Sequence, residues 1–374
     1  MRLRALACAL TGALATMLAG GCVHGSPPSP PAAALGTMID EQASALSPGT
    51  GLVLRVEAPP LNLAWAQARG DSADPAQAFR IASVTKTFVA AAVLRLVENG
   101  RLDLNAPIEP YLPADLADLL KSDGYDLSRM TVRMLLGHTA GLYDYAEDPA
   151  FQSRVMNEPG HVWSRKEQVA FAVEHGDPIA APGERFAYSD TGYILLGSII
   201  ETVAGQTMAE AVRALLDFER LGLAATWFED LESAPAKAPG RAQQRIGAFD
   251  VLSIDASADL FGGGGLISTT SDLTRFFQAL LQGDVLREPS LAAMMQPSAQ
   301  SQAAGQEGYG MGLNLHTVNG VDCFGHGGFW GVLVWSCPSR DLTVAGFVTN
   351  TTERAVLTDA TEAALHNLIA AGGE

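Results

Sequence analysis

Charged residues are scarce in this 374-residue sequence, and basic residues are scarcer than acidic ones. Charged side chains make up 17% of the chain, with 24 lysines and arginines against 41 aspartates and glutamates. The resulting net charge of −17 opposes binding to nucleic acid or to anionic membrane surfaces. Hydrophobic residues make up 48%, which excludes an intrinsically disordered chain, and the length allows a sizeable buried core.

Several motifs of other enzyme classes are missing. The sequence has no G-x-S-x-G nucleophile elbow, no H-E-x-x-H zinc helix and no phosphate-binding loop. It also has no internal repeat and no second low-complexity linker. We therefore predict one composite domain.

The N-terminal residues are typical of an export signal. Two arginines precede an apolar stretch over residues 5–18, which is too short to span a bilayer. Small residues stand directly before Cys22, as in a bacterial lipoprotein box, which predicts removal of residues 1–21 and lipidation of Cys22. Ordinary cleavage near Gly21 is the alternative, and it would leave a free soluble protein.

A proline-rich stretch follows the predicted signal. Residues 26–31 contain four prolines, and such a segment behaves as an extended spacer. We predict a tether over residues 22–35 that joins a lipid anchor to a globular domain of residues 36–374. The protein would then be exported and periplasmic, with the lipid as its only contact with a membrane.

Only two cysteines, Cys323 and Cys337, remain in the predicted domain, and an even number fits an oxidising compartment. If the segment between them is a hairpin that turns near Phe329 and Trp330, the cysteines face each other on adjacent antiparallel strands. We therefore predict a disulfide between them.

Strand-like alternation occurs near both ends of the chain, with helical patterns between. The predicted strands cover residues 51–57, 61–66, 310–315, 331–335 and 342–348. The predicted helices cover residues 36–46, 84–98, 191–204 and 355–371. The fold class is mixed α/β (α+β), with an antiparallel sheet from both chain ends (residues 36–100 and 246–374), flanking helices and an inserted helical part (residues 101–245).

The segment around Ser83 carries the first candidate catalytic groups. Lys86 comes three residues after Ser83 at the start of a predicted helix, so both side chains lie on one face. A hydroxyl is a weak nucleophile until a neighbour takes its proton, and burial favours the neutral lysine that could do so. The chain has only four lysines, and the apolar stretch over residues 88–96 indicates a buried helix. A serine helix cap beside a surface lysine is the alternative.

Tyr188, Ser189 and Asp190 stand at the start of a second apolar helix. A phenol close to a lysine ammonium would have its ionised form favoured, and it could carry a proton during catalysis. A helix cap with a packed tyrosine would give the same pattern.

A third segment places glycines on both sides of a histidine, in His326-Gly327-Gly328. Glycines let the edge of a strand approach a ligand closely. A turn-rich loop with an incidental histidine is the alternative.

In this order and spacing, the three segments resemble the motifs of the beta-lactamase-related serine hydrolases, which include D-Ala-D-Ala carboxypeptidases, class C beta-lactamases, D-aminopeptidases and esterases. Ser83-Val-Thr-Lys86 matches their S-x-x-K motif. Tyr188-Ser189-Asp190 stands where they carry Y-x-N, and His326-Gly327-Gly328 where they carry K/H-x-G. Residues 135–142 and 263–273 also match segments of this family.

The resemblance implies a beta-lactamase/transpeptidase-like fold and an acyl-enzyme mechanism that needs neither a metal nor another cofactor. Ser83 would attack a carbonyl carbon while Lys86 and Tyr188 exchange its proton. The backbone N–H groups of Ser83 and Phe329 would form the oxyanion hole. His138, in residues 135–142, is expected to support the fold. The residues expected to contact substrate are Asp190, His326, Gly327 and Gly328.

Departures from the family pattern bear on the substrate. Asp190 replaces an asparagine, which would favour a charged Lys86 and move the role of base toward Tyr188. Gly327 replaces a threonine or serine that helps to bind a terminal carboxylate, so carboxylate recognition is in doubt. His326 in place of lysine argues against a typical class C beta-lactamase.

Three functions stay open at this level. The first is a hydrolase of peptidoglycan-type D-amino-acid peptides or related amides, similar to a D-alanyl-D-alanine carboxypeptidase. The second is a carboxylesterase with little beta-lactam activity. The third is a penicillin-recognition fold that only binds its ligand.

Overall fold

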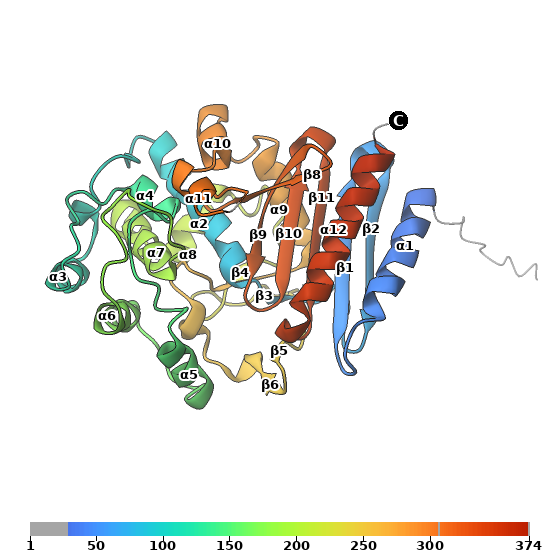
Figure 1. Ribbon diagram of the computed structural model, residues 1–374, viewed down its shortest axis with the longest axis horizontal. Coiled ribbons are helices and arrows are strands. Elements are labelled where there is room, and N and C mark those ends of the chain that lie inside the picture. The colour runs from blue at the N-terminus through green and yellow to red at the C-terminus, as the bar shows by residue number, and fades with distance from the viewer. Residues whose placement is uncertain (1–28, 306, 373–374) are drawn as a thin grey trace, which may run out of the picture.

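The computed structural model describes residues 29–305 and 307–372, so the predicted signal and Cys22 lie outside the described residues. Within these ranges, the largest sheet has six antiparallel strands in the order β2-β1-β11-β10-β9-β8 (Figure 1). Its strands are β1 (Gly51–Ala58), β2 (Leu63–Gly70), β8 (Asn314–Val318), β9 (Val321–Gly328), β10 (Val332–Cys337) and β11 (Leu342–Val348). Since β1 pairs with β11, the predicted sheet built from both chain ends is confirmed.

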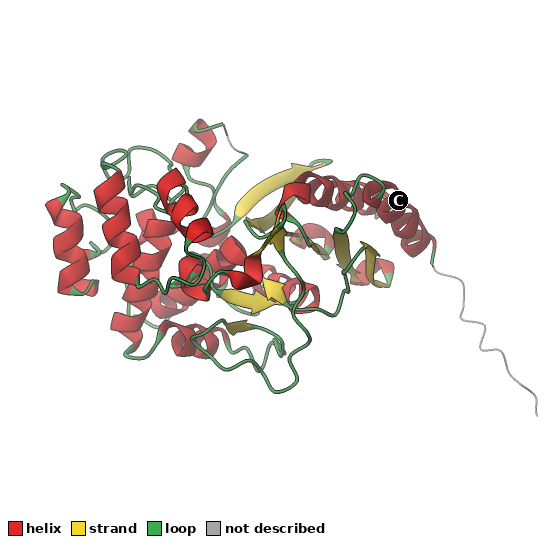
Figure 2. Ribbon diagram, turned by 90° about the horizontal axis from the view of Figure 1, so that it is seen from below, coloured by secondary structure: helices red, strands yellow, loops and turns green. Residues whose placement is uncertain are grey.

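Helices cover both faces of this sheet, as Figure 2 shows from below. They are α1 (Pro30–Ala43) and α12 (Arg354–Ala371) on one face and α9 (Thr270–Leu281) on the other. Leu52, Leu54 and Val56 of β1 belong to the core beneath α1 and α12. Val53 and Phe347 belong to the core on the opposite face. Because both faces are covered, β1 and β11 are apolar along nearly their whole length.

Several predicted boundaries were wrong, and two of them concern the tether and the start of β8. Helix α1 begins at Pro30, not at Gly36, so the tether predicted over residues 22–35 extends too far. Proline is tolerated in a first turn because its missing N–H would have no partner there, and Leu35 is buried. Strand β8 begins at Asn314 because the residues before it contact α2: the Gly312 carbonyl accepts a hydrogen bond from the Thr87 hydroxyl at 2.7 Å.

The helical part lies beside one end of the sheet (Figure 1). Its central helix, α2 (Thr85–Glu98), is buried along most of its length and contacts α7 and α8. The other helices of this part are α3 (Ala114–Ser122), α4 (Val132–Leu136), α5 (Pro149–Asn157), α6 (Arg165–His175), α7 (Asp190–Ala204) and α8 (Met208–Leu216). No helix in residues 29–305 and 307–372 has the length and apolar character needed to cross a membrane.

Short elements join the two parts. A small sheet has the order β3-β7-β4, a separate hairpin pairs β5 with β6, and two short helices precede β8. These elements are β3 (Phe79–Arg80), β4 (Trp227–Phe228), β5 (Arg245–Ile246), β6 (Phe249–Asp250), β7 (Leu266–Ser268), α10 (Glu288–Met295) and α11 (Ala299–Ala303). Strand β3 leads directly into the segment that carries Ser83.

The hairpin of β9 and β10 joins Cys323 and Cys337 by a disulfide, with the two Cα atoms 4.0 Å apart. The register pairs Phe324 with Ser336, which puts the two cysteines opposite each other at the next position. Both cysteines are buried beneath α12.

We predict that reduction of this disulfide destabilises the domain without unfolding it. The bond closes a loop with a sequence separation of 14, so its loss should lower the free energy of unfolding by about 3 kcal/mol. Urea unfolding of the oxidised and the reduced wild-type protein measures the difference, and this comparison leaves side-chain packing unchanged. Equal midpoints for the two forms would contradict the prediction.

Candidate active site

Ser83 lies in a single 3₁₀ turn (Ala82–Val84) between β3 and α2. The turn is anchored by the N–H of Ile81, which donates to the carbonyl of Leu266 on β7 at 3.0 Å. Ala82 has φ +46°, a left-handed conformation that is uncommon for a residue with a Cβ atom. Such strain is concentrated at functional sites, where the surrounding structure imposes it. The strained turn presents Ser83 to a cavity beside α2.

Lys86 is fully buried, and its ammonium group has three acceptors. Its Nζ atom donates to the Ser83 Oγ atom at 2.8 Å, to the Gly263 carbonyl at 2.7 Å and to the Asp190 carboxylate. Burial alone would lower the pKa of Lys86, but the charge of Asp190, the interaction with Tyr188 and the hydrogen bonds to both together outweigh it and raise that pKa above its usual value. Of the two sequence-based expectations, the one from Asp190 is therefore supported and the one from burial alone is not, and the ion pair favours the ammonium form of Lys86.

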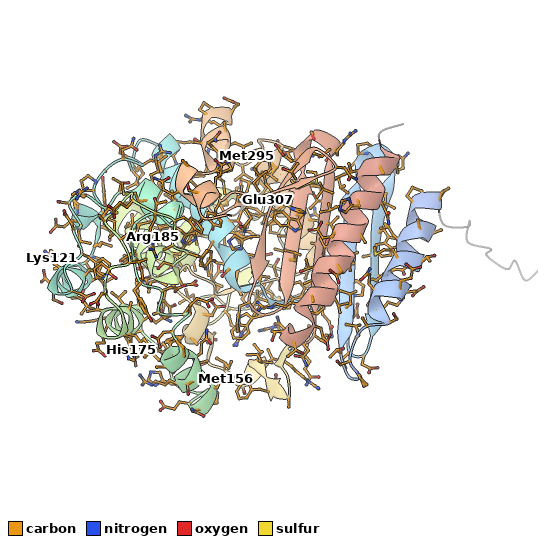
Figure 3. The ribbon with its side chains drawn as sticks, in the orientation of Figure 1. Lys121, Met156, His175, Arg185, Met295 and Glu307 are labelled. Carbon is orange, nitrogen blue, oxygen red and sulfur yellow. A yellow bond between two sulfur atoms is a disulfide. The ribbon has the colours of Figure 1, made fainter. Side chains whose placement is uncertain are left out.

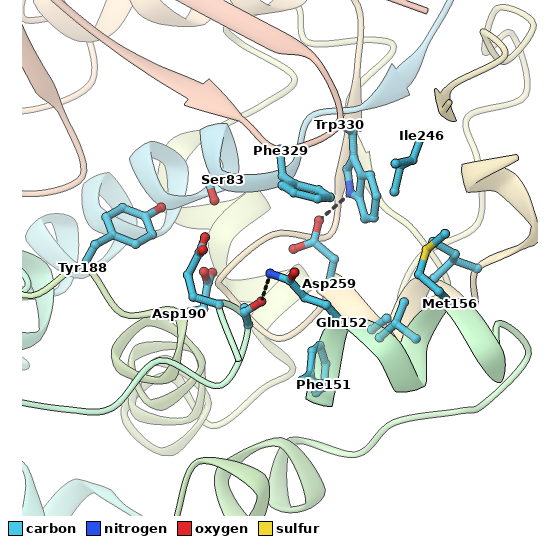
Figure 4. Close-up of a pocket in the computed structure, with 15 residues that line it drawn as sticks. Ser83, Phe151, Gln152, Met156, Tyr188, Asp190, Ile246, Asp259, Phe329 and Trp330 are labelled. Carbon is cyan, nitrogen blue, oxygen red and sulfur yellow. Dashed lines mark hydrogen bonds between the residues drawn. The ribbon is translucent and has the colours of Figure 1, made fainter. Parts of the chain in front are cut away.

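Tyr188 completes the group around Ser83. Its hydroxyl points toward Ser83 (Figure 4), and the Lys86 Nζ atom lies 5.0 Å from the centre of its ring. Burial raises the pKa of Tyr188, although the charge of Lys86 and the interactions of the hydroxyl with Lys86 and Ser83 act in the opposite direction. The sequence-based expectation of an ionised phenol was wrong because burial outweighs the nearby cation.

Strand β9 ends against the turn of Ser83. A Cβ atom on Gly328 would overlap the carbonyl oxygen of Ile81, so only glycine allows this approach. Phe329 follows directly and lines the same cavity as Ser83. The structure thus brings together the two residues expected to supply the oxyanion hole.

The other predicted contacts differ in position. Asp190 lines the cavity, whereas His326, Gly327 and Gly328 are not among its lining residues. The ring of His326 is buried and contacts the Tyr309 hydroxyl at 3.1 Å and the Gly327 carbonyl at 2.7 Å. Burial, together with the charge of Lys86, lowers the pKa of His326 to about 3, so it is neutral. The expected direct contact of His326 with substrate is therefore not supported.

The cavity is apolar on most of its wall. Helix α5 and the β5–β6 hairpin form one side, and Met156 lies there at the end of α5 (Figure 3). Its large apolar lining residues are Phe151, Val155, Met156, Ile246, Ile254, Phe329 and Trp330. The polar lining includes three carboxylates, from Glu147, Asp190 and Asp259, and no lysine, arginine or histidine of the described chain lines it.

Sequence analysis missed two carboxyl groups of this site. Asp259 accepts a hydrogen bond from the Trp330 Nε1 atom at 2.8 Å, and burial together with the charge of Asp190 raises its pKa to about 7. Asp144 lies behind the cavity, where its Oδ1 atom accepts the backbone N–H of Asp190 at 3.1 Å. Burial raises the pKa of Asp144 well above its usual value. Neither residue stands in a recognisable motif, because each reaches the site through a loop.

Comparisons with known proteins agree with this geometry. A model of the Beta-lactamase protein family matches residues 45–368. The chain belongs to the beta-lactamase family. Among solved structures, the D-stereospecific amidohydrolase from a Streptomyces species is 29% identical, with a TM-score of 0.76 over 88% of this chain and 98% of that protein. The D-amino acid amidase from Ochrobactrum anthropi is 24% identical with a TM-score of 0.74 over 91% and 99%, which shows the shared fold.

Curated relatives of this beta-lactamase family member match over shorter segments. Penicillin-binding protein 4* of Bacillus subtilis is 28% identical over 235 residues, which are 59% of this chain and 48% of that protein. The putative penicillin-binding protein PbpX of Bacillus subtilis is 25% identical over 64% of this chain and 54% of that protein. The chain therefore spans about half the length of these relatives.

No metal site accompanies these groups in the part of the chain that the structure describes. Histidine, cysteine, aspartate and glutamate side chains nowhere gather there in a group of three or more that could hold an ion. The chemistry that the arrangement can support is that of its own side chains: a hydroxyl nucleophile, a permanent cation and a neutral phenol.

We predict that Gly328→Ala abolishes most of the activity while Gly327→Ala does not. The new Cβ atom at position 328 would push β9 away from Ile81 and displace the N–H of Phe329, and loss of one oxyanion donor costs about 100-fold or more in kcat. A Cβ atom on Gly327 would meet the Leu333 Cδ1 atom at 3.7 Å and the Val332 carbonyl oxygen at 3.8 Å, both ordinary contacts. Steady-state kinetics of both variants test this pair, and equal losses would contradict it.

Proposed function

We propose that this protein is a serine hydrolase that forms an acyl-enzyme on Ser83 and cleaves amides or short peptides of D-amino acids. The observation that carries the proposal is the contact of the Ser83 hydroxyl with the Lys86 ammonium, beside Tyr188 and at the wall of an open cavity. Membership of the beta-lactamase family supports the same reaction class.

Proton transfer in this proposal runs through Tyr188. All three N–H groups of the Lys86 ammonium already have acceptors, so Lys86 does not take the proton of Ser83. As the Ser83 Oγ atom bonds to the carbonyl carbon, its proton passes to the Tyr188 oxygen, and Tyr188 gives its own proton to the leaving nitrogen. This concerted exchange keeps the buried phenol neutral throughout.

Charge stabilisation is the task of the surrounding groups. The Lys86 ammonium stabilises negative charge on the Ser83 oxygen during attack, since the two atoms are in hydrogen-bond contact. The N–H groups of Ser83 and Phe329 receive the negative charge that develops on the carbonyl oxygen. When the carbon–nitrogen bond has broken, water attacks the ester through the same proton exchange in reverse.

The charge of the cavity favours a substrate with a free amine. The Lys86 ammonium offsets the charge of Asp190, whereas the lining carboxyl groups of Glu147 and of ionised Asp259 attract an ammonium group and repel a carboxylate. Gly327 also lacks the hydroxyl that would help to bind a terminal carboxylate. The apolar wall suits an aliphatic or aromatic side chain on the acyl part. Two similar solved structures are named as D-specific amide hydrolases, which supports the D configuration.

The second candidate is a carboxylesterase with little beta-lactam activity, which the missing hydroxyl at Gly327 also favours. The names of the curated relatives favour a penicillin-binding protein instead. Export, with a lipid anchor on Cys22, remains part of the proposal and is supported by the sequence of residues 1–22. An exported enzyme would meet D-amino-acid peptides of peptidoglycan.

Turnover of a matched substrate panel tests the function. D-phenylalanine amide should be cleaved faster than its L-enantiomer and than a D-alanyl-D-alanine peptide, and Ser83→Ala should remove all activity. Preferred release of D-alanine, with stable labelling by a fluorescent penicillin, would replace the proposal by the carboxypeptidase. Turnover of p-nitrophenyl acetate alone would indicate the esterase, and no turnover at all would indicate a binding protein.

Asp259 should govern the preference for the free amine. We predict that Asp259→Asn raises KM for D-phenylalanine amide about tenfold, equivalent to about 1.4 kcal/mol of lost charge attraction. The N-acetylated amide, which has no ammonium group, should show no change and serves as the control.

The same carboxyl group should give the reaction a pH dependence. Because its pKa is raised to about 7, Asp259 gains its charge as the pH rises toward 7, and kcat/KM for the amine substrate should rise there and fall again as the substrate's α-amine, with a pKa of about 8, loses its proton. The rise should be absent in Asp259→Asn. Identical pH profiles for the two proteins would contradict the assignment.

A further inference from the structure

A chain of hydrogen bonds runs behind the cavity and joins two histidines through Tyr309. The N–H of Ser189 donates to the His138 Nδ1 atom at 3.1 Å, and the His138 Nε2 atom lies 3.2 Å from the Tyr309 hydroxyl. That hydroxyl lies 3.1 Å from the His326 Nε2 atom, and the His326 Nδ1 atom lies 2.7 Å from the Gly327 carbonyl. The three side chains are buried, and none lines the cavity.

The donors and acceptors in this chain of hydrogen bonds can be arranged in only one order. A backbone N–H can only donate, so the His138 Nδ1 atom accepts and its Nε2 atom carries the proton. His138 then donates to the Tyr309 oxygen, which leaves the Tyr309 proton for His326. His326 in turn donates from its Nδ1 atom to the Gly327 carbonyl. Burial lowers the pKa of both histidines, so both are the neutral tautomers that this pattern requires.

At one end of this chain of hydrogen bonds, His138 fixes the backbone on both sides of Tyr188. The carbonyl of His138 accepts the N–H of Ala187 at 2.8 Å, while its ring accepts the N–H of Ser189. His138 has φ +54°, a conformation that lets one residue present its carbonyl and its ring to the same segment. The ring centres of His138 and Tyr188 are 4.1 Å apart. Tyr188 is thus bracketed by contacts with a single residue.

At the other end of this chain of hydrogen bonds, His326 fixes the strand that leads to the oxyanion donor. The carbonyl of Gly327 precedes Gly328, whose backbone contacts Ile81, and Phe329 follows. This chain of hydrogen bonds therefore connects the segment of Tyr188, which transfers protons, with the strand end before Phe329, whose N–H stabilises the oxyanion. Neither segment is close to the other in sequence.

We propose that His138, Tyr309 and His326 are positioning residues that set the distance between Tyr188 and the end of β9 around Ser83. This inference rests on the proton-transfer role of Tyr188 in the proposed function. A displaced Tyr188 would protonate a leaving nitrogen poorly. With the p-nitrophenyl ester, Tyr188 still takes the Ser83 proton and releases its own to water, but p-nitrophenolate departs without that proton, so the ester depends less on the position of Tyr188.

The test compares two substrates with the same acyl group, D-phenylalanine p-nitroanilide and D-phenylalanine p-nitrophenyl ester, in Tyr309→Phe. This change removes one hydroxyl and keeps the aromatic ring. We expect kcat/KM, which reports acylation, to fall about 10- to 100-fold on the anilide and by a clearly smaller factor on the ester. In a Tyr188→Phe background, Tyr309→Phe should cause no further loss on the anilide.

Matched variants keep the test decisive. Tyr125→Phe removes another buried hydroxyl, which accepts the N–H of Tyr143 at 3.1 Å, and it should lower neither rate selectively. If Tyr309→Phe does not fold, His326→Asn replaces it, because asparagine retains a donor for the Gly327 carbonyl and loses the link to Tyr309. The same selective loss on the anilide is then expected.

Equal losses on anilide and ester, or an undiminished effect in the Tyr188→Phe background, would overturn the positioning role. Such a result would leave the hydrolase function standing. Failure of the function itself would look different, because wild-type protein would then cleave neither substrate in a Ser83-dependent way.

Discussion

The buried ion pair of Lys86 and Asp190 is the interaction on which the active site depends. A cation without solvent contact must be paired, and Asp190, Gly263 and Ser83 together satisfy every N–H group of the ammonium. This fixes the charge state of the site before a substrate arrives. With the lysine committed as a cation, the acid–base role passes to Tyr188, whose burial keeps it neutral.

The fold makes this arrangement possible by joining distant segments. The sheet is completed only when β1 and β11, from opposite ends of the chain, pair with each other. Strand β9 of that sheet then meets the turn before α2, while α7 supplies Asp190 from the helical part. Loops add the carboxyl groups of Glu147 and Asp259 to the wall of the cavity, while Asp144 lies behind it and accepts the N–H of Asp190.

The sequence predicted the parts of the fold that depend on local patterns. Apolar, strand-like patterns marked β1 and β11, and the spacing of Cys323 and Cys337 around a turn indicated their bond. The sequence left the charge of Lys86 open between burial, which favours the neutral amine, and Asp190, which favours the ammonium, because only the structure shows that this carboxylate 104 residues away contacts the lysine. The contacts of His138 were missed for the same reason. Its motif identifies the histidine but does not indicate that Tyr309, 171 residues further along the sequence, lies against it.

The most direct test of the account is the titration of Lys86 by NMR with lysine labelled at the Cε carbon. The chain has only four lysines, so its spectrum is simple, and the signal of Lys86 is identified by its absence in Lys86→Met. The account predicts that this signal keeps the shift of an ammonium from about pH 6 to about pH 10, because the folded-state pKa is raised above its usual value. A titration midpoint below about pH 8 would show a lysine that can act as the base, and it would contradict the central claim.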